Sequence, residues 1–256
     1  MRVSAVKKSL QMLKKTFRKI WKDGAEDVIV AAVYELEASK SKFDKRSSQS
    51  HDKRLVPEPW GYRISPKQPL CFGPSTAIKG LSCRLDLYCT VLWKQEEELP
   101  VKQEITVRLW SDELNYIYRE DWDSPDVYSK LTDERVMARW HFDLANPGQS
   151  GPKYHLQFGG NARSDELHWF PEIIKIPRFA YPPMDLILVC QMIAANFYRD
   201  DYASVREDSI WKSCVFESQQ HLLLDYYKRC VTEIERKKPS FEHEKKPLLD
   251  VLWNTE

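Results

Sequence analysis

The sequence predicts an α+β protein: an N-terminal helical hairpin, an antiparallel sheet of four or more strands, and C-terminal helices packed on the apolar face of that sheet. Three observations predict this class. Apolar residues recur every three or four positions near the N-terminus, alternate with polar residues between positions 83 and 158, and dominate a helix-length run after position 185. With 256 residues, the chain is long enough for one or two domains with a sizeable core.

The first 43 residues predict a basic helical arm. Residues 1–22 contain eight Lys or Arg and no Asp or Glu, and Asp23 and Gly24 separate this segment from a second apolar stripe. The charged, Ser- and Pro-containing residues 44–59 predict a solvated connection, and residues 60–256 the α+β body. The apolar stripe of the first helix consists of Val3, Val6, Leu10, Leu13, Phe17 and Ile20.

The basic side of the first helix allows three interpretations. It can neutralise nucleic-acid phosphates, lie on an anionic membrane, or simply surround an apolar stripe that packs on the second helix or on a partner. Packing is the simplest interpretation, and nucleic acid comes second. The candidate nucleic-acid-binding residues are Lys7, Lys8, Lys14, Lys15, Arg18 and Lys19.

Four segments alternate apolar and polar residues with the period of half-buried strands. Because alternate residues of a strand lie on opposite faces, their polar residues share one face of the predicted sheet. The four segments are 83–93, 105–110, 139–144 and 154–158.

Two histidines on this polar face are the candidate catalytic residues. If His141 lies opposite residue 155 or 157, the facing Cβ atoms are about 5 Å apart. His141 and His155 would then suit acid and base roles in a metal-independent ribonuclease or phosphodiesterase, with Arg139 stabilising a phosphoryl charge and with Asp143 and Gln157 nearby.

Other interpretations of the same face stay open. Asp143 and the two histidines could bind a divalent metal, or the face could bind another chain. His-x-Asp and His-x-Gln are not specific spacings, so the simplest interpretation is the ordinary solvated face of a sheet. We predict no metal and no cofactor.

The C-terminal part predicts helices. Residues 186–197 are apolar nearly all round, as in a buried helix, and residues 203–237 predict one or two more. The tail 247–254 is apolar enough to dock on the body. The predicted inward residues of the last helix are Leu223, Tyr226, Tyr227, Cys230, Val231 and Ile234.

Composition narrows the function classes. The 39 basic and 38 acidic residues give no overall case for nucleic acid. Six cysteines without CxxC spacing, no signal peptide and no apolar run of membrane-spanning length predict a reduced, cytoplasmic protein. Phosphate-loop, dinucleotide, zinc-protease and serine-hydrolase motifs are absent.

Tryptophans in predicted loops, on the polar sheet face or at element ends suggest contacts with a partner. They are Trp60, Trp110, Trp122, Trp169 and Trp253.

Two resemblances add expectations. The order helix, four-stranded meander, irregular segment, helices resembles the ubiquitin-conjugating fold, but no Cys stands where that family keeps its nucleophile, which implies at most an inactive relative. The stretch "YHLQFGGN" followed by "IPRFAYPPMDLIL" resembles uncharacterised bacterial proteins of defence or mobile-element gene clusters. That resemblance implies no activity and transfers no catalytic residue.

We therefore expect a non-catalytic accessory subunit of a larger cytoplasmic assembly. Its partners would be one or more proteins, with nucleic acid as a further candidate contact and bacterial defence as a candidate setting. The oligomeric state stays open. The alternative is the ribonuclease or phosphodiesterase that uses His141 and His155.

Overall fold

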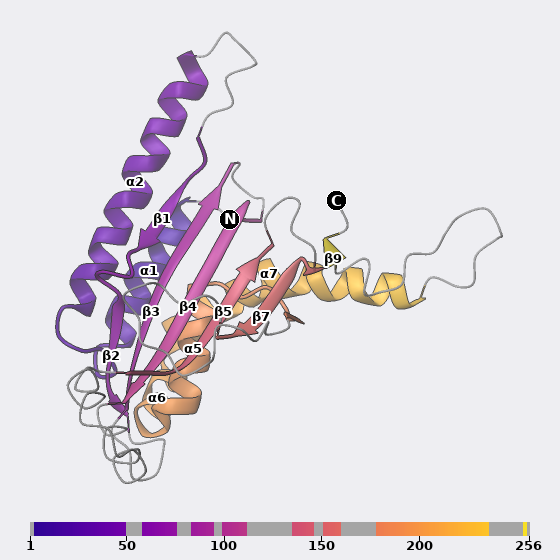
Figure 1. Cartoon of the computed structure of the whole chain (residues 1–256). Coiled ribbons are helices and arrows are strands. Elements are labelled where there is room, and N and C mark those ends of the chain that lie inside the picture. Colours follow the sequence, from indigo (N-terminus) through magenta and orange to yellow (C-terminus); the bar gives the residue numbers. More distant parts are fainter. Residues whose placement is uncertain are drawn as a thin grey trace, which may run out of the picture.

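A computed structural model describes most of the chain and confirms the α+β class. The described residues are 3–49, 58–75, 83–94, 99–111, 135–145, 151–159, 178–235 and 253–254. Helices precede and follow an antiparallel sheet along the chain (Figure 1).

The four predicted strands form the centre of the sheet. They are β3 (Cys83–Trp93), β4 (Lys102–Ser111), β5 (Arg135–Leu144) and β7 (Tyr154–Phe158), each antiparallel to the next. Three strands that the alternation did not predict extend this sheet. β1 (Trp60–Ile64) and β2 (Leu70–Ser75) pair with opposite ends of β3, and β8 (Phe179–Ala180) pairs with β7.

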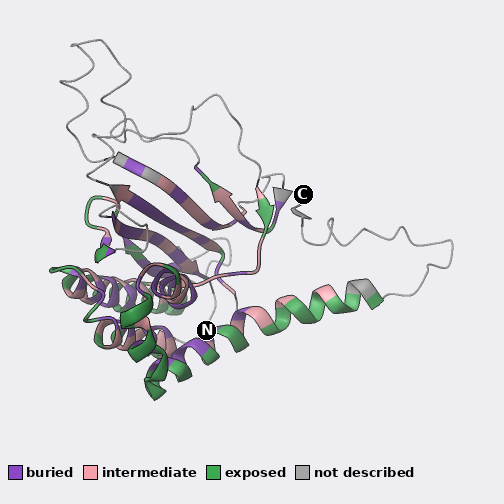
Figure 2. Cartoon of the chain, turned by 90° about the horizontal axis from the view of Figure 1, so that it is seen from below, coloured by how far each residue is buried: buried purple, intermediate pink, exposed green. Residues whose placement is uncertain are grey.

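Helices cover one face of the sheet (Figure 2). They are α1 (Val3–Thr16), α5 (Leu186–Phe197), α6 (Arg199–Glu207) and α7 (Ser209–Glu235), while α2 (Ala25–Gln49) runs beside β1. The odd-numbered apolar residues of β3 point into this layer because side chains alternate along a strand. Two short strands, β6 (Gly151–Pro152) and β9 (Trp253–Asn254), pair separately.

The N-terminal helices belong to the same core as the sheet and are not a separate arm. Leu13 of α1 and Phe17, directly after the helix, are fully buried in the hydrophobic cluster that also contains the strands. The Phe17 ring lies 4.7 Å from that of Trp211 in α7, measured between centroids. α2 also continues through Gln49, well into the predicted connection. Residues 3–43 are therefore an integral part of the body.

The outer edge of β1 is covered by α2. The Ser39 hydroxyl donates to the Gly61 carbonyl at 2.7 Å and accepts from the Gly61 amide at 3.0 Å. Two residues along the strand, the Arg63 amide donates to the Glu35 carboxylate at 2.9 Å. Alternate residues of an edge strand present their amides outward. Ser39 and Glu35, one helical turn apart on α2, therefore provide hydrogen-bond partners for the outward backbone groups of β1.

The tryptophans do not all follow the surface interpretation. Trp60 is fully buried in β1 and stacks on Trp93 with ring centroids 5.1 Å apart, so the surface assignment was wrong there. Trp110 is half-buried on the polar sheet face. Trp253 lies in β9, and Trp122 and Trp169 are outside the described residues.

All six cysteines lie in the described residues, and none of them forms a disulfide bond. Cys83, Cys89, Cys190 and Cys214 are buried. Burial raises the pKa of the Cys89 thiol to about 12, which keeps it protonated and unreactive. The buried cysteines thus act as small apolar side chains.

Candidate functional site

The strand register places the predicted catalytic residues on one face. His141 lies opposite Gln157, and Asp143 lies opposite His155, on β5 and β7. On the other side, β4 places Thr106 beside His141. This is one of the two predicted registers.

His141 has both ring nitrogens engaged. The Gly159 carbonyl lies 2.7 Å from Nε2, and because a carbonyl only accepts, Nε2 must carry the proton. Nδ1 then accepts from the Thr106 hydroxyl at 3.0 Å. Burial, aided by the charge of Arg139, lowers the His141 pKa to about 4. A neutral imidazole with no free nitrogen holds β4, β5 and the end of β7 together, and it is poorly placed to move a proton.

His155 and Asp143 lie opposite each other on the same face. The His155 Nδ1 donates to the Pro152 carbonyl at 3.1 Å, and burial lowers the His155 pKa. Burial, followed by the nearby Glu104 charge, raises the Asp143 pKa to about 7. Its Oδ1 is buried without a hydrogen-bond partner among the described residues. Asp143 therefore titrates in the neutral range, whereas His141 does not.

The polar face is only partly solvated. His141, Asp143 and Gln157 are half-buried, whereas the buried residues of this face are Asp86, Thr106, Arg108, Arg139 and His155. Arg108 binds Asp86 through two hydrogen bonds, Nε to Oδ1 at 2.7 Å and Nη2 to Oδ2 at 2.8 Å. Trp110 Nε1 donates to the same carboxylate at 3.0 Å. Arg139, opposite Arg108, is also buried. Buried ion pairs of this kind demand complete hydrogen bonding, which suits a fixed scaffold.

In the described part of the chain, no group of three or more His, Cys, Asp or Glu side chains is placed to hold a metal ion. Three further polar residues that could extend the site, Asp165, Glu166 and His168, lie outside the described residues. So does His51, one half of an Arg-x4-His pair with Arg46, which itself lies in α2.

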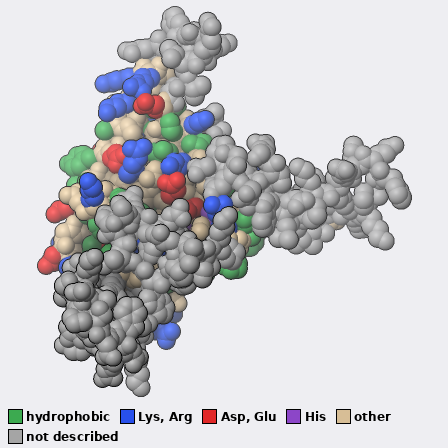
Figure 3. Space-filling view, viewed as in Figure 1, with side chains coloured by type: hydrophobic (Ala, Val, Ile, Leu, Met, Phe, Trp, Pro, Cys, Tyr) green, Lys and Arg blue, Asp and Glu red, His purple; other side chains and the backbone are tan. Residues whose placement is uncertain are grey.

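The basic side of α1 is matched by carboxylates of the same chain. Lys8 pairs with Glu217 at 3.3 Å, and Lys7 pairs with Glu37. Lys14 and Arg18 both contact Glu26, whereas Lys15 and Lys19 are exposed. Basic and acidic side chains also alternate on the surface over α2 (Figure 3). Four of the six candidate nucleic-acid contacts thus have an acidic neighbour that lowers the local positive potential.

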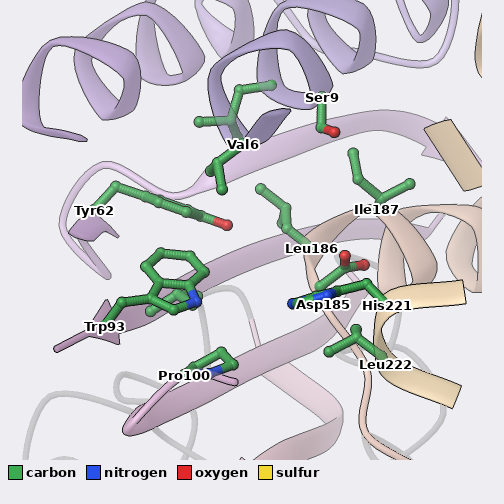
Figure 4. A pocket seen from close by; sticks show the side chains of 12 residues that line it. Val6, Ser9, Tyr62, Trp93, Pro100, Asp185, Leu186, Ile187, His221 and Leu222 are labelled. Carbon is green, nitrogen blue, oxygen red and sulfur yellow. The ribbon is translucent and has the colours of Figure 1, made fainter. Parts of the chain in front are cut away.

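A small cavity lies between α1, the sheet, α5 and α7 (Figure 4). Its volume is about 30 Å³, room for about one water molecule. Trp93 Nε1 and His221 Nε2 are buried near it without hydrogen-bond partners among the described residues, and Asp185 also lines it. The cavity suits an ordered water and is too small for an organic substrate.

α7 carries apolar residues on two opposite faces. Trp211, Val215 and Leu222 are buried against the body. With 3.6 residues per turn, five further large apolar residues fall within an arc of about 120° on the other side. We call this second stripe the outer face of α7: Ile210, Phe216, Leu224, Tyr227 and Val231, exposed by 48%, 60%, 40%, 51% and 48%.

The predicted inward set of α7 was therefore wrong for Tyr227 and Val231, which are exposed, and Leu223, Tyr226 and Cys230 are only half-buried. The side chain of Ile234 is not described. The sequence does carry the signal: apolar residues between positions 210 and 231 form two stripes rather than one. Nothing in the sequence alone tells which of the two stripes the body covers.

Among the described helices, none has the length and apolar character needed to cross a membrane. No protein-family model, curated protein or solved structure matches the chain. The geometry of the described residues is therefore the basis for a functional assignment.

Proposed function

We propose that this protein is a non-catalytic subunit of a protein assembly and that it binds a protein partner through the outer face of α7. The observation that carries the proposal is the exposure of five large apolar side chains on one face of one helix. Isolated exposed apolar residues are ordinary, but several large ones on one face of a helix are typical of an interaction surface.

The shape of the stripe favours a protein as the partner. Leu224, Tyr227 and Val231 follow the spacing i, i+3, i+7 of helices that dock in apolar grooves or against other helices. α7 also extends away from the sheet, and most of its outer length is exposed or half-buried (Figures 1 and 2). A partner can therefore reach it without displacing another described element.

The basic side of α1 supports nucleic-acid binding less well. Its cations are shared with Glu26, Glu37 and Glu217, so a phosphate backbone would have to compete with carboxylates already in place. For this reason we propose a protein rather than a nucleic acid as the partner.

The test compares two double variants of the full chain that differ only in the side of α7 they change. Phe216→Ser with Tyr227→Ser alters the outer face. Lys212→Ser with Gln219→Ser changes two exposed residues away from it and is the control. Proteins of the source cells retained by wild type and control but not by the outer-face variant are identified and purified. Their affinities are then measured with each variant at matched thermal stability.

We expect the outer-face variant to bind the purified partner at least ten-fold more weakly, since two central aromatic side chains often contribute most of an interface's affinity. The control should bind like the wild type. Equal affinity in both variants, or the loss of no partner, would reject the proposal. A variant that releases lipid vesicles but no protein would reject it in favour of membrane binding.

A hydrolase acting on phosphodiesters is the second candidate, and one observation favours it. Asp143 has a pKa of about 7 and faces His155 across the β5–β7 pair, as a general acid or base requires. Turnover of an RNA oligonucleotide by the wild type, lost at least a hundred-fold in Asp143→Asn but not in Gln157→Ala, would establish it. If the wild type shows no turnover, the hydrolase function is rejected and only the interaction function remains.

A further inference from the structure

The centre of the outer face of α7 has a symmetric spacing about Gln220. Gln220 is exposed and lies within the same arc as the five apolar residues. Phe216 and Leu224 lie four positions from it on either side, and Ser213, a small residue in the same arc, lies seven positions before it as Tyr227 lies seven after it. Ile210 and Val231, at ten and eleven positions, lie outside this symmetric part.

Such a stripe fits a copy of itself running in the opposite direction. A two-fold axis through Gln220 brings each position before it opposite the equivalent position after it on the second copy. Phe216 then meets Leu224 of the other copy, and this large apolar contact occurs twice. The small Ser213 faces the large Tyr227, which lets the helices approach closely without overfilling the interface.

Gln220 suits the centre of such a pair. Its carboxamide carries both a donor and an acceptor, so two copies on a two-fold axis can hydrogen-bond to each other. A single polar residue inside an apolar stripe also fixes the register of paired helices, because any shift would bury the amide against carbon.

The charges beside the stripe are compatible with the same arrangement. Glu217 and Lys228 lie on one flank of the stripe and have opposite signs. Antiparallel pairing puts Glu217 of each copy on the same edge of the interface as Lys228 of the other. Glu217 also contacts Lys8 of its own chain, so its charge is already balanced before association.

We propose that the occupant of the outer face of α7 is a second copy of this chain, paired antiparallel about a two-fold axis at Gln220. This inference rests on the proposed function and names its partner. From Ile210 to Val231 the stripe is about 30 Å long at 1.5 Å per residue, comparable to the diameter of a small domain. The contact is thus long enough to orient two whole bodies.

The test is a pair of single cysteine variants of the full chain. Gln220→Cys places a thiol on the proposed axis, where two copies can form a disulfide. Gln219→Cys is the matched control, because that neighbouring residue is also exposed but lies on another side of α7. Wild type measures the background from the six native thiols. Mild oxidation followed by non-reducing electrophoresis gives the rate of covalent dimer formation, and sedimentation of the wild type gives its mass in solution.

We expect Gln220→Cys to cross-link at least ten-fold faster than Gln219→Cys, and the addition of Phe216→Ser and Tyr227→Ser to abolish that difference, because the thiols meet only when the helices pair. Equal rates in the two cysteine variants, or a wild type that sediments as a monomer throughout, would overturn the inference. A monomer that still binds another purified protein through the outer face would overturn only the inference that the partner is a second copy. A monomer that binds neither a second copy nor another protein would overturn the proposed function as well.

Discussion

α1 and α7 lie in the same helical layer, yet they differ in how much of their apolar surface is buried. Val6, Leu10 and Leu13 of α1 are buried, and most of the basic residues of this helix contact carboxylates of the chain. α7 buries one apolar stripe and leaves a second one in solvent. α1, whose basic residues stand out in the sequence, thus has most of its apolar and charged side chains in contact with the same chain. α7, which is less conspicuous in the sequence, has the exposed apolar surface. The exposed apolar stripe of α7 is therefore better evidence of an interaction site than the basic pattern of α1.

The largest expected effect separates equal substitutions in the two helices. Leu13→Ala in α1 removes a fully buried side chain and should lower the free energy of unfolding by about 3 kcal/mol. Leu224→Ala on the outer face of α7 should change it by less than about 0.5 kcal/mol. Urea unfolding at low protein concentration measures both. Equal losses would show that the outer face is covered within a single chain.

The polar face of the sheet should behave like α1. His141→Ala leaves the Thr106 hydroxyl and the Gly159 carbonyl without their ring partner, so we expect a loss of about 2 kcal/mol. Gln157→Ala, opposite in the register, is the control and should cost less. Chemical unfolding of the three proteins tests this. If the His141→Ala protein has normal stability, His141 is not a structural residue and is again a candidate catalytic residue.

His141 should also make the protein sensitive to acid. Its pKa is lowered from 6.5 to about 4 in the folded state, so the unfolded chain binds this proton first. Its stabilising contribution is complete above pH 6.5 and is lost as the pH falls towards 4. Wild type should therefore lose more stability than His141→Ala between pH 7 and pH 5, measured by urea unfolding. Parallel losses would mean that other groups cause the acid sensitivity.

The edge of β1 offers a smaller effect of the same kind. Ser39→Ala removes the hydroxyl that satisfies both backbone groups of Gly61, and we expect a loss of about 1 kcal/mol with faster hydrogen exchange at that amide. Ser41→Ala, exposed on the same helix, serves as the control. Unchanged exchange at Gly61 would argue that α2 does not protect this edge.

The smallest effect concerns the charges that distinguish α1. Lys8→Gln breaks an exposed ion pair with Glu217 and should alter the free energy of unfolding by less than about 0.5 kcal/mol. Affinity for a DNA or RNA oligonucleotide, measured at low salt, should not change either. A clear loss of oligonucleotide binding would restore nucleic acid as a partner of α1.

The sheet centre was predictable because its signal is local. The alternation of apolar and polar residues from Cys83 to Val91 identifies both the strand and its apolar side without knowledge of neighbours. β1 was missed because its residues Trp60–Ile64 show no clean alternation. Four of its five residues are buried, since α2 and β3 enclose it, and only tertiary contacts determine that.

The candidate site was predictable only in part. Parity placed Arg139, His141, Asp143, His155 and Gln157 on one face, and the register confirms it. Parity does not say whether that face is wet, and burial is what turns His141 into a structural group and raises the pKa of Asp143. In α7 both stripes contain large apolar residues, and the stripe that is buried is the one that faces the rest of the helical layer, which includes α1 and α5.

The contact of α1 with α7 bears on how the chain acquires its fold during synthesis. Phe17 rests on Trp211, a partner about 200 residues later, which leaves the ribosome roughly 10 to 40 seconds afterwards at ordinary elongation rates. Throughout that interval the apolar stripe of the first helix has no permanent neighbour from the C-terminal layer. We therefore expect chaperones to act on this N-terminal segment during that interval, and the core to close only after α7 has left the ribosome.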